Sequence, residues 1–405
     1  MRALVFDLSL AKVVGARLLK RPSLLVRGPL SGLRIADVPE PPLPAPTWVR
    51  VGVDSCGLCG SDLAVIAYKA SPALSPWSSF PCVLGHEVLG RIVEVGASVR
   101  SLAPGMRVAI DPFLGCLARD VEPCAACAGD LHALCERQVD GPLPGMLMGM
   151  TRSVPGGFSE RVVAHQSQIV VVPDALDGDV AALLEPLSVG LHAVLRRPPR
   201  DGDKVLVIGG GAIALVTIAA IRLAGLAADV TASVRTGAQA ELATALGRRA
   251  RSVRAGRSSR RSSRGKRCAP APSDPGPACG GRGFSLVLDC VGGKESLQLA
   301  LRFVRPRGAV TLVGNAGELP RVDFSFLWAK EAELVGTLAY GGEHVGARRV
   351  RTFELCAERA AASPLPLGRI VSERRPLLDY ATVVARNFDR DRTGVFKSLL
   401  LPGAP

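Results

Sequence analysis

The fold is decided by a stretch at residues 204–214, whose sequence is KVLVIGGGAIA. Its first five residues are apolar apart from Lys204, a pattern typical of a parallel strand that is buried on both faces. The glycines Gly209 to Gly211 follow directly, and the apolar residues up to about Leu223 predict a helix. Glycine lets backbone N–H groups approach a pyrophosphate held at a helix N-terminus. The stretch therefore predicts a dinucleotide site at Gly209 and Gly211, with Ala214 in the third glycine position of the pattern.

Strands and helices alternate on the C-terminal side of this stretch. Residues 229–234 predict a second strand and residues 238–246 a second helix. Later strands are expected at 285–290, 309–313 and 333–337. The alternation of strands and helices predicts a doubly wound α/β sheet.

The end of the second strand is where a dinucleotide-binding protein often carries an acid for a free ribose hydroxyl. Here the sequence is Ser233-Val234-Arg235, without an acid. An arginine suits a 2′-phosphate, so Ser233 and Arg235 favour NADP over NAD. The alternative is that Arg235 is a solvated residue at the start of a helix.

The first half of the chain has a different pattern. Short segments rich in valine and isoleucine predict strands at 49–53, 88–95, 107–111 and 168–172. We expect an irregular β-barrel over residues 1–188, the dinucleotide-binding domain over 189–342, and a return to the barrel over 343–405.

Two motifs in the barrel half carry the residue types of a catalytic zinc site, CGLCGSD at 56–62 and GHE at 85–87. Catalytic zinc takes about three protein ligands and keeps one position open. Cys59, His86 and Glu87 could supply them, or a later acid could replace Glu87. The alternative is a pair of buried thiols beside a surface His-Glu pair.

Two neighbours of Cys59 are expected to assist this site. Asp62 is placed to orient the ligating histidine, and Ser61 offers a hydroxyl that could pass on the alcohol proton.

A second set of cysteines has the spacing of a structural zinc site. Cys124, Cys127 and Cys135 provide three thiolates, and a tetrahedral site needs four. Cys116 is the expected fourth ligand. A degraded site without metal is the alternative.

The order of these motifs resembles that of the zinc-containing medium-chain dehydrogenase/reductase family, the alcohol dehydrogenases. The motif EPLSVGLH at 185–192 completes the set, and its Glu185 matches the sorbitol and threonine dehydrogenase branch. The resemblance implies a GroES-like barrel domain, a Rossmann domain and a cleft between them. It also implies hydride transfer between an alcohol or carbonyl and NADP or NAD, catalytic and structural zinc, Glu185 near the catalytic zinc, and a homodimer or homotetramer.

The chain departs from the family pattern at three places. Ala64 stands where many members carry a proton-relay histidine, and Val121 stands where the first cysteine of the lobe is expected. Residues 248–283 contain Val253 as their one Val, Ile, Leu, Met or Phe, so we expect no buried strand and helix there. A compensated reading-frame error would explain this segment; a genuine insertion or a nucleic-acid-binding tail would also do so.

Charge and hydropathy limit the classes of protein that remain. The net charge is +14, but one short segment supplies most of it: residues 248–267 hold nine arginines and one lysine without an acid. The basic charge is therefore local and does not indicate a basic binding face, so nucleic acid is not expected as a partner. No run of about 18 apolar residues exists, and Asp7 interrupts any signal peptide, so we expect a cytoplasmic enzyme with no membrane partner. The alternative functions are an impaired dehydrogenase relative and a basic nucleic-acid-binding or regulatory protein on the same scaffold.

Overall fold

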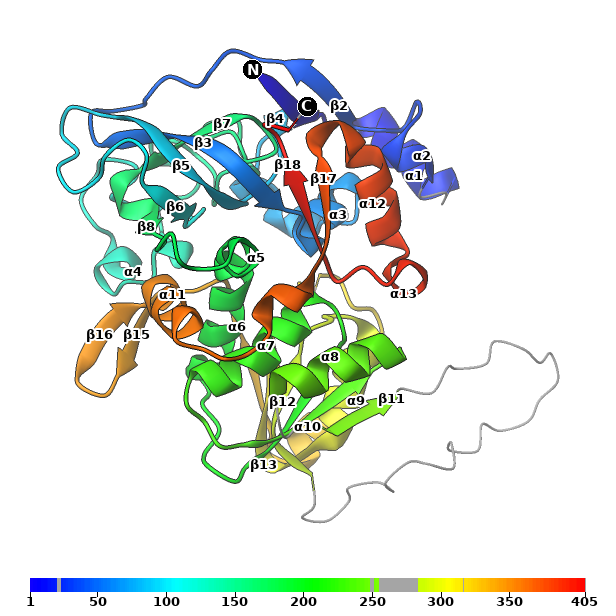
Figure 1. Cartoon of the computed structure of the whole chain (residues 1–405). Helices are drawn as coiled ribbons and strands as arrows, with labels where there is room; N and C mark the ends of the chain where they lie inside the picture. The colour runs from blue at the N-terminus through cyan, green and yellow to red at the C-terminus, as the bar shows by residue number, and fades with distance from the viewer. Residues whose placement is uncertain (20–22, 248–250, 255–282, 316, 405) are drawn as a thin grey trace. The chain divides into compact units, whose positions relative to one another are not determined.

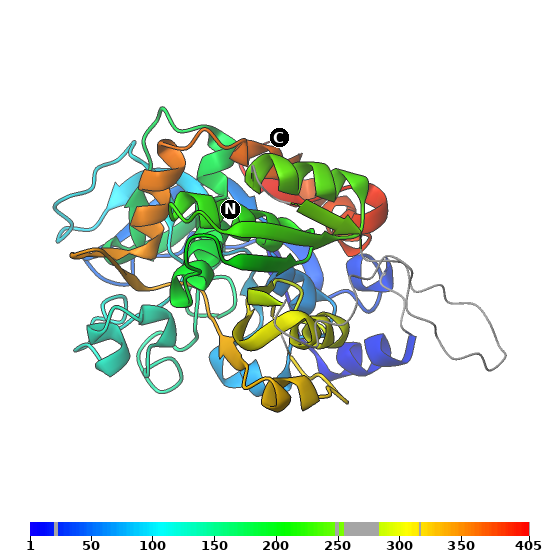
Figure 2. The same ribbon diagram turned by 90° about the horizontal axis from the view of Figure 1, so that it is seen from below.

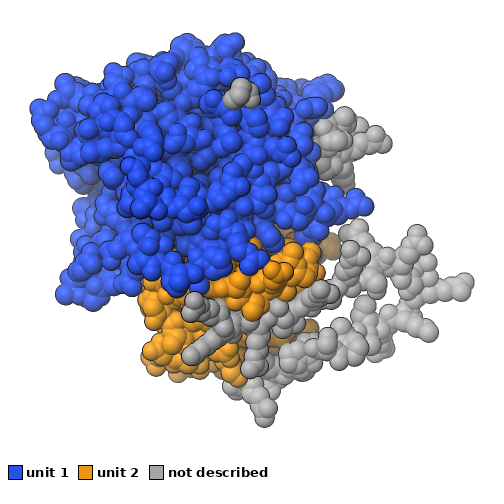
Figure 3. Space-filling model, in the orientation of Figure 1, with its two compact units in different colours: residues 1–192, 338–405 blue, residues 193–337 orange. Residues whose placement is uncertain are grey.

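The computed structural model describes residues 1–19, 23–247, 251–254, 283–315 and 317–404. The chain forms two compact units, one of residues 1–192 with 338–405 and one of residues 193–337 (Figure 3). None of the described helices is long and apolar enough to cross a membrane.

The core of the first unit is a seven-stranded sheet. Six of its strands follow the order β17-β18-β3-β5-β6-β8, and the seventh, β7, pairs with β3. Its strands are β3 (Trp48–Gly57), β5 (Glu87–Val95), β6 (Arg107–Ile110), β7 (Arg161–His165), β8 (Ile169–Val171), β17 (Val371–Pro376) and β18 (Lys397–Leu401). All four strands expected from the first half of the sequence are present. A smaller sheet joins β1 (Arg2–Phe6) to β2 (Leu33–Asp37) and β4 (Cys82–Val83).

Strand β3 brings three distant segments together at its C-terminal end. Cys56 lies opposite Val88 of β5 and opposite Leu400 of β18. Figure 1 shows β18, from the far end of the chain, beside β3. The residues that follow β3, precede β5 and begin β18 therefore meet in one place.

Short helices complete the first unit. They include α3 (Gly60–Ile66), α5 (Gly178–Ala182), α11 (Thr352–Ala361) and α12 (Tyr380–Phe388). The helix α6 (Leu184–Arg196) begins in this unit and ends in the second. Two helices that the sequence analysis did not predict, α1 (Leu10–Leu19) and α2 (Ser23–Val26), follow β1. Val13 and Ala16 of α1 pack against the hydrophobic core of the barrel.

The second unit is a parallel sheet in the order β11-β10-β9-β12-β13-β14. Its strands are β9 (Lys204–Ile208), β10 (Asp229–Val234), β11 (Arg251–Arg254), β12 (Phe284–Asp289), β13 (Val304–Leu312) and β14 (Glu333–Gly336). The helices are α7 (Ala212–Leu223), α8 (Gly237–Gly247), α9 (Lys294–Phe303) and α10 (Ser325–Ala329), and Figure 2 shows helices on both sides of the sheet. The doubly wound α/β fold is confirmed.

We expected no buried strand in residues 248–283, but residues 251–254 do form a strand of this sheet. Strand β11 pairs in parallel with β10, with Val253 opposite Ser233. It lies at the edge of the sheet, where a strand bonds one neighbour through its backbone and its side chains need not all be buried. The expected helix and the remaining basic residues, 248–250 and 255–282, lie outside the described residues.

Candidate functional site

Three side chains expected at a catalytic zinc converge in the first unit. The ligand atoms of Cys59, His86 and Glu87 all lie within 4.8 Å of one another. Cys59 precedes α3, and His86 and Glu87 lie where the chain enters β5, so the pairing of β3 with β5 brings the two motifs together. A thiolate, an imidazole and a carboxylate at this separation fit a zinc ion.

Asp62 lies beside the histidine that it is expected to orient. Its Oδ1 lies 3.4 Å from His86 Nδ1, and its Oδ2 accepts a hydrogen bond from the Cys59 backbone N–H at 2.9 Å. Burial lowers the pKa of His86, but the charge and hydrogen bond of Asp62 raise it well above its usual value. His86 Nε2 faces the other way, 3.4 Å from the Ser61 hydroxyl, so this nitrogen is the one available to a metal.

Glu87 has a second partner that the sequence did not reveal. Lys397, the first residue of β18, forms a buried ion pair with its carboxylate. Glu87 is 1% and Lys397 2% exposed, so water cannot screen the pair. The carboxylate fits against β3 because Gly57 has no side chain; a Cβ there would lie 1.9 Å from Glu87 Oε2.

Glu185 lies in the first turn of α6 and is also buried. Desolvation and the neighbouring Glu87 raise its pKa to about 8. The Tyr340 hydroxyl donates a hydrogen bond to Glu185 Oε1 at 3.3 Å. The second acid of the site is therefore able to hold a proton near neutral pH, whereas Glu87 is engaged by a lysine.

The four cysteines expected to hold a structural zinc also meet. The sulfurs of Cys116, Cys124, Cys127 and Cys135 lie within 4.8 Å of one another, and those of Cys116 and Cys135 are 3.6 Å apart. Cys116 supplies the fourth sulfur, since Val121 stands where a cysteine ligand was expected. Val121 packs against the cluster. Four sulfurs this close together provide the number and type of ligands that structural zinc takes.

Backbone N–H groups already point at these sulfurs. Cys116 N–H donates to Cys127 Sγ at 3.3 Å, Cys124 N–H to Cys116 Sγ at 3.4 Å, and Glu136 N–H to Cys124 Sγ at 3.4 Å. Burial raises the pKa of Cys124, but the hydrogen bonds from the Glu136 and Cys127 backbone lower it to about 7. Cys124 thus favours the thiolate, the form that binds metal, whereas burial raises the pKa of Cys127 and of Cys135.

The glycine turn of the second unit has the geometry expected of a phosphate-binding loop. Gly209 has a φ of +127°, a conformation that favours glycine, and its N–H bonds the Ser233 carbonyl of β10 at 3.0 Å. Gly211 is the N-cap of α7, and Ala214 lies buried in its first turn. A Cβ on Gly210 would lie 2.4 Å from the Gln239 side chain, so Gly209 is constrained by its conformation and Gly210 by space.

Arg235 follows β10 directly and is exposed. Its backbone N–H donates to Gln239 Oε1 at 2.8 Å, which fixes the turn into α8. The structure thus places Ser233 and Arg235 at the end of the strand adjacent to the one that carries the glycine turn.

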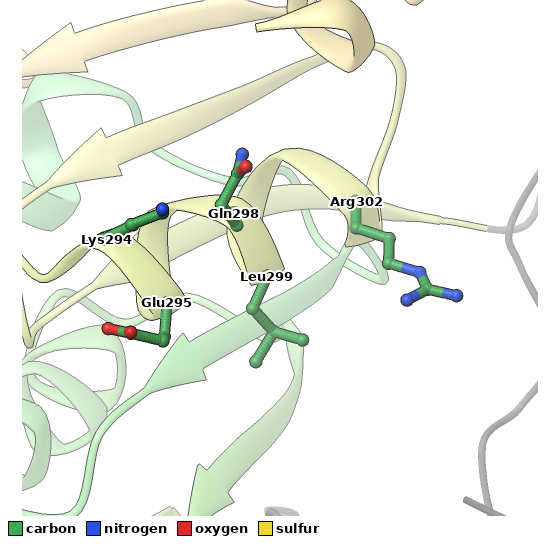
Figure 4. A pocket seen from close by; sticks show the side chains of 5 residues that line it. All are labelled: Lys294, Glu295, Gln298, Leu299 and Arg302. Carbon is green, nitrogen blue, oxygen red and sulfur yellow. The ribbon is translucent and has the colours of Figure 1, made fainter. Parts of the chain in front are cut away.

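The described residues also line two hollows. One, of about 290 Å³, is lined by residues of the helix α9 (Figure 4), none of which is a predicted site residue. The other, of about 310 Å³, adjoins Cys116 and Cys127 and contains the ion pair of Asp111 Oδ2 with His132 Nε2, at 2.7 Å. The sequence analysis singled out neither residue of this pair.

The comparisons with known proteins agree with the site geometry. Residues 45–174 match the family "Alcohol dehydrogenase GroES-like domain", and residues 212–352 match the family "Zinc-binding dehydrogenase". A diacetyl reductase ((R)-acetoin forming) of Saccharomyces cerevisiae is 30% identical over 323 residues, covering 74% of this chain and 72% of the relative. Human sorbitol dehydrogenase is 27% identical over 358 residues, covering 88% and 89%.

Solved structures show the same relationship. A zinc-binding dehydrogenase from Sinorhizobium meliloti, bound to NADP, is 27% identical with a TM-score of 0.68 and covers 91% of this chain and 95% of its own. The cofactors expected from the sequence, zinc and NADP or NAD, are those of such proteins. The chain belongs to the zinc-containing medium-chain alcohol dehydrogenase family, in its sorbitol dehydrogenase-like branch, and is a zinc-dependent NAD(P) oxidoreductase of alcohols and carbonyls.

Proposed function

We propose that the Cys59–His86 cluster is the catalytic centre, with Asp62, Ser61 and either Glu87 or Glu185 completing it. The observation that carries this is the convergence of Cys59, His86 and Glu87 within 4.8 Å, with Asp62 behind the histidine. We assign residues 1–188 and 343–405 to the catalytic domain and residues 189–342 to the cofactor domain.

When bound, zinc supplies a Lewis acid for the substrate oxygen, and the dinucleotide supplies the hydride acceptor or donor. Cys59 and His86 would hold the metal, and Asp62, beside Nδ1, would keep the imidazole in the orientation that leaves Nε2 free to bind it. The half-buried Ser61 hydroxyl, 3.4 Å from that nitrogen, would accept the proton of the alcohol as it releases its own proton to solvent. Ala64 offers no group to take this proton further.

The third ligand is tested by comparing two conservative variants. Glu87→Gln and Glu185→Gln each keep the shape of the side chain and remove its charge. The variant that loses zinc, measured by elemental analysis of protein purified without chelator, identifies the ligand. If both variants keep a full complement of zinc, neither carboxylate is the third ligand.

We propose a substrate whose reacting alcohol lies next to a second oxygen. The relatives are named for sorbitol, diacetyl, butanediol and L-galactonate, which are polyols, vicinal diols or diketones and hydroxy acids. A panel of vicinal diols, polyols and simple secondary alcohols, each with NAD and with NADP, tests this. Higher kcat/KM for simple alcohols than for diols would contradict it.

We propose a homodimer as the smallest assembly, formed at the outer edge of the Rossmann sheet. Strand β14 has β13 as its neighbour on one side only, and its residues are half-buried or exposed. The nearby segment 324–328 exposes Phe324, Phe326 and Trp328, the last 75% exposed. A backbone edge with apolar side chains beside it favours association with another copy. Trp328→Glu should shift the mass measured by light scattering toward the monomer; an unchanged mass would exclude this surface.

We further propose a cytoplasmic location. All nine cysteines that the structure places are free thiols. Reduced thiols in metal-binding spacing favour a reducing compartment. Fractionation of the producing cells, followed by detection of the enzyme, tests the location.

A further inference from the structure

Arg119 is a buried cation beside the four-cysteine cluster. It lies in the segment between Cys116 and Cys124, and only 3% of its surface is exposed. A tight turn holds it there, because its backbone N–H bonds the carbonyls of Gly115 and Cys116 at 3.3 and 3.1 Å.

The neighbours of its guanidinium supply hydrogen-bond acceptors but little charge. Nη2 donates to the Gly145 carbonyl at 2.5 Å and Nη1 to the Gly115 carbonyl at 3.4 Å. Nη1 also lies 4.0 Å from Cys135 Sγ, and Nε has no hydrogen-bond partner.

The charge of the cluster depends on whether metal is bound. Four neutral thiols would leave the arginine buried without a counter-charge, which proteins avoid. Four thiolates around Zn²⁺ carry a net charge of −2, and a guanidinium at this distance offsets half of it. The buried arginine is therefore complementary to the negative charge that the four sulfurs carry as thiolates around a divalent cation.

We propose that Arg119 is a positioning residue of the structural zinc centre, which supplies the counter-charge to the zinc–thiolate group through Cys135. The proposal rests on the zinc-binding role that we propose for the four cysteines. Arg119 and the substitute ligand Cys116 come from the same departure from the family pattern. One short segment thus supplies both the fourth sulfur and the buried charge beside the cluster.

The test measures zinc release rather than turnover. All variants are made in a Cys59→Ala background, so that the four-cysteine site is the only proposed zinc site left. Arg119→Met keeps the volume of the side chain and removes its charge; Arg119→Lys keeps the charge and loses the planar fork. Arg137→Met, an exposed arginine two residues after Cys135, is the matched control. The rate at which zinc passes to a chromophoric chelator is followed by absorbance, and folding by circular dichroism.

We expect Arg119→Met to release zinc about 10- to 100-fold faster than its parent, the range measured for residues that support metal ligands. Arg119→Lys should fall between the two, and Arg137→Met should match the parent. Equal release rates for Arg119→Met and the parent would overturn the proposal. If Arg119→Met does not fold, Arg119→Lys and Arg119→Gln test the proposal instead. Zinc release from both variants at the rate of the parent would overturn it. A parent that contains no zinc would instead refute the structural zinc site itself.

Discussion

Replacing Lys397 by Met tests whether the buried ion pair beside the catalytic cluster stabilises the barrel unit. Lys397 and Glu87 are 2% and 1% exposed, so removal of the ammonium group leaves a carboxylate buried without a partner. Breaking a buried pair from one side costs about 3–5 kcal/mol. At roughly 2–4 °C per kcal/mol for a unit of this size, the melting temperature should fall by about 6–20 °C.

The assay is thermal unfolding of metal-stripped protein, with Lys69→Met as a control because Lys69 is exposed. The double variant Lys397→Met/Glu87→Gln should regain much of the lost stability, since it removes both charges. A melting temperature for Lys397→Met equal to that of Lys69→Met would refute the reasoning. Repeating the measurement with zinc bound also tests whether Glu87 is a zinc ligand. If it is, the fall in melting temperature of Lys397→Met becomes smaller, because the zinc ion supplies the counter-charge to Glu87.

Three further outcomes are expected. Glu185 has a pKa raised from 4.5 to about 8, so its contribution to the stability of metal-stripped protein is full below about pH 4.5 and is lost as the pH rises through about 8; Glu185→Gln should flatten that part of the pH profile of the melting temperature, and an unchanged profile would contradict the shift. Arg235→Ala should raise the Kd of NADP by at least about tenfold and leave that of NAD nearly unchanged, as titration of cofactor fluorescence would measure; equal losses would show that Arg235 does not bind the 2′-phosphate. Elemental analysis should find two zinc ions per chain, one of which is absent from Cys59→Ala and the other from Cys127→Ala, the latter with a lower melting temperature; protein purified without chelator and free of zinc would contradict both sites.

Local patterns in the sequence predicted the Rossmann half well. The strand 204–208 and the strand 229–234 have the same bounds in the structure, and the helix to Leu223 ends where expected. These elements depend on neighbours close in sequence: an apolar run, a glycine turn and a second apolar run. Cys116 was also identified correctly as a member of the cysteine cluster, because a tetrahedral zinc site needs a fourth ligand and Cys116 was the nearest thiol before the motif.

The contacts that the sequence did not reveal join residues far apart in the chain. Lys397 pairs with a carboxylate 310 residues away, and Tyr340 with one 155 residues away. No periodicity or spacing records such a pair; the only signal was a lysine at the start of the apolar strand KSLLL. The strand at 251–254 was missed for a different reason: hydropathy measures side chains, whereas an edge strand is held through its backbone.

The position of β18 beside β3 also constrains the order in which the protein assembles during synthesis. Residues 193–337 form a compact unit of their own, and the ribosome completes it before it reaches β18. Domains fold as units while the chain emerges, so the inserted unit can fold while the barrel still lacks two strands. Until then Glu87 has no lysine, and β3 leaves the edge that will receive Leu399 and Leu400 open. The barrel is therefore a late product of translation although it contains the first residues of the chain, and its exposed β3 edge is the place where a nascent chain would need protection by a chaperone.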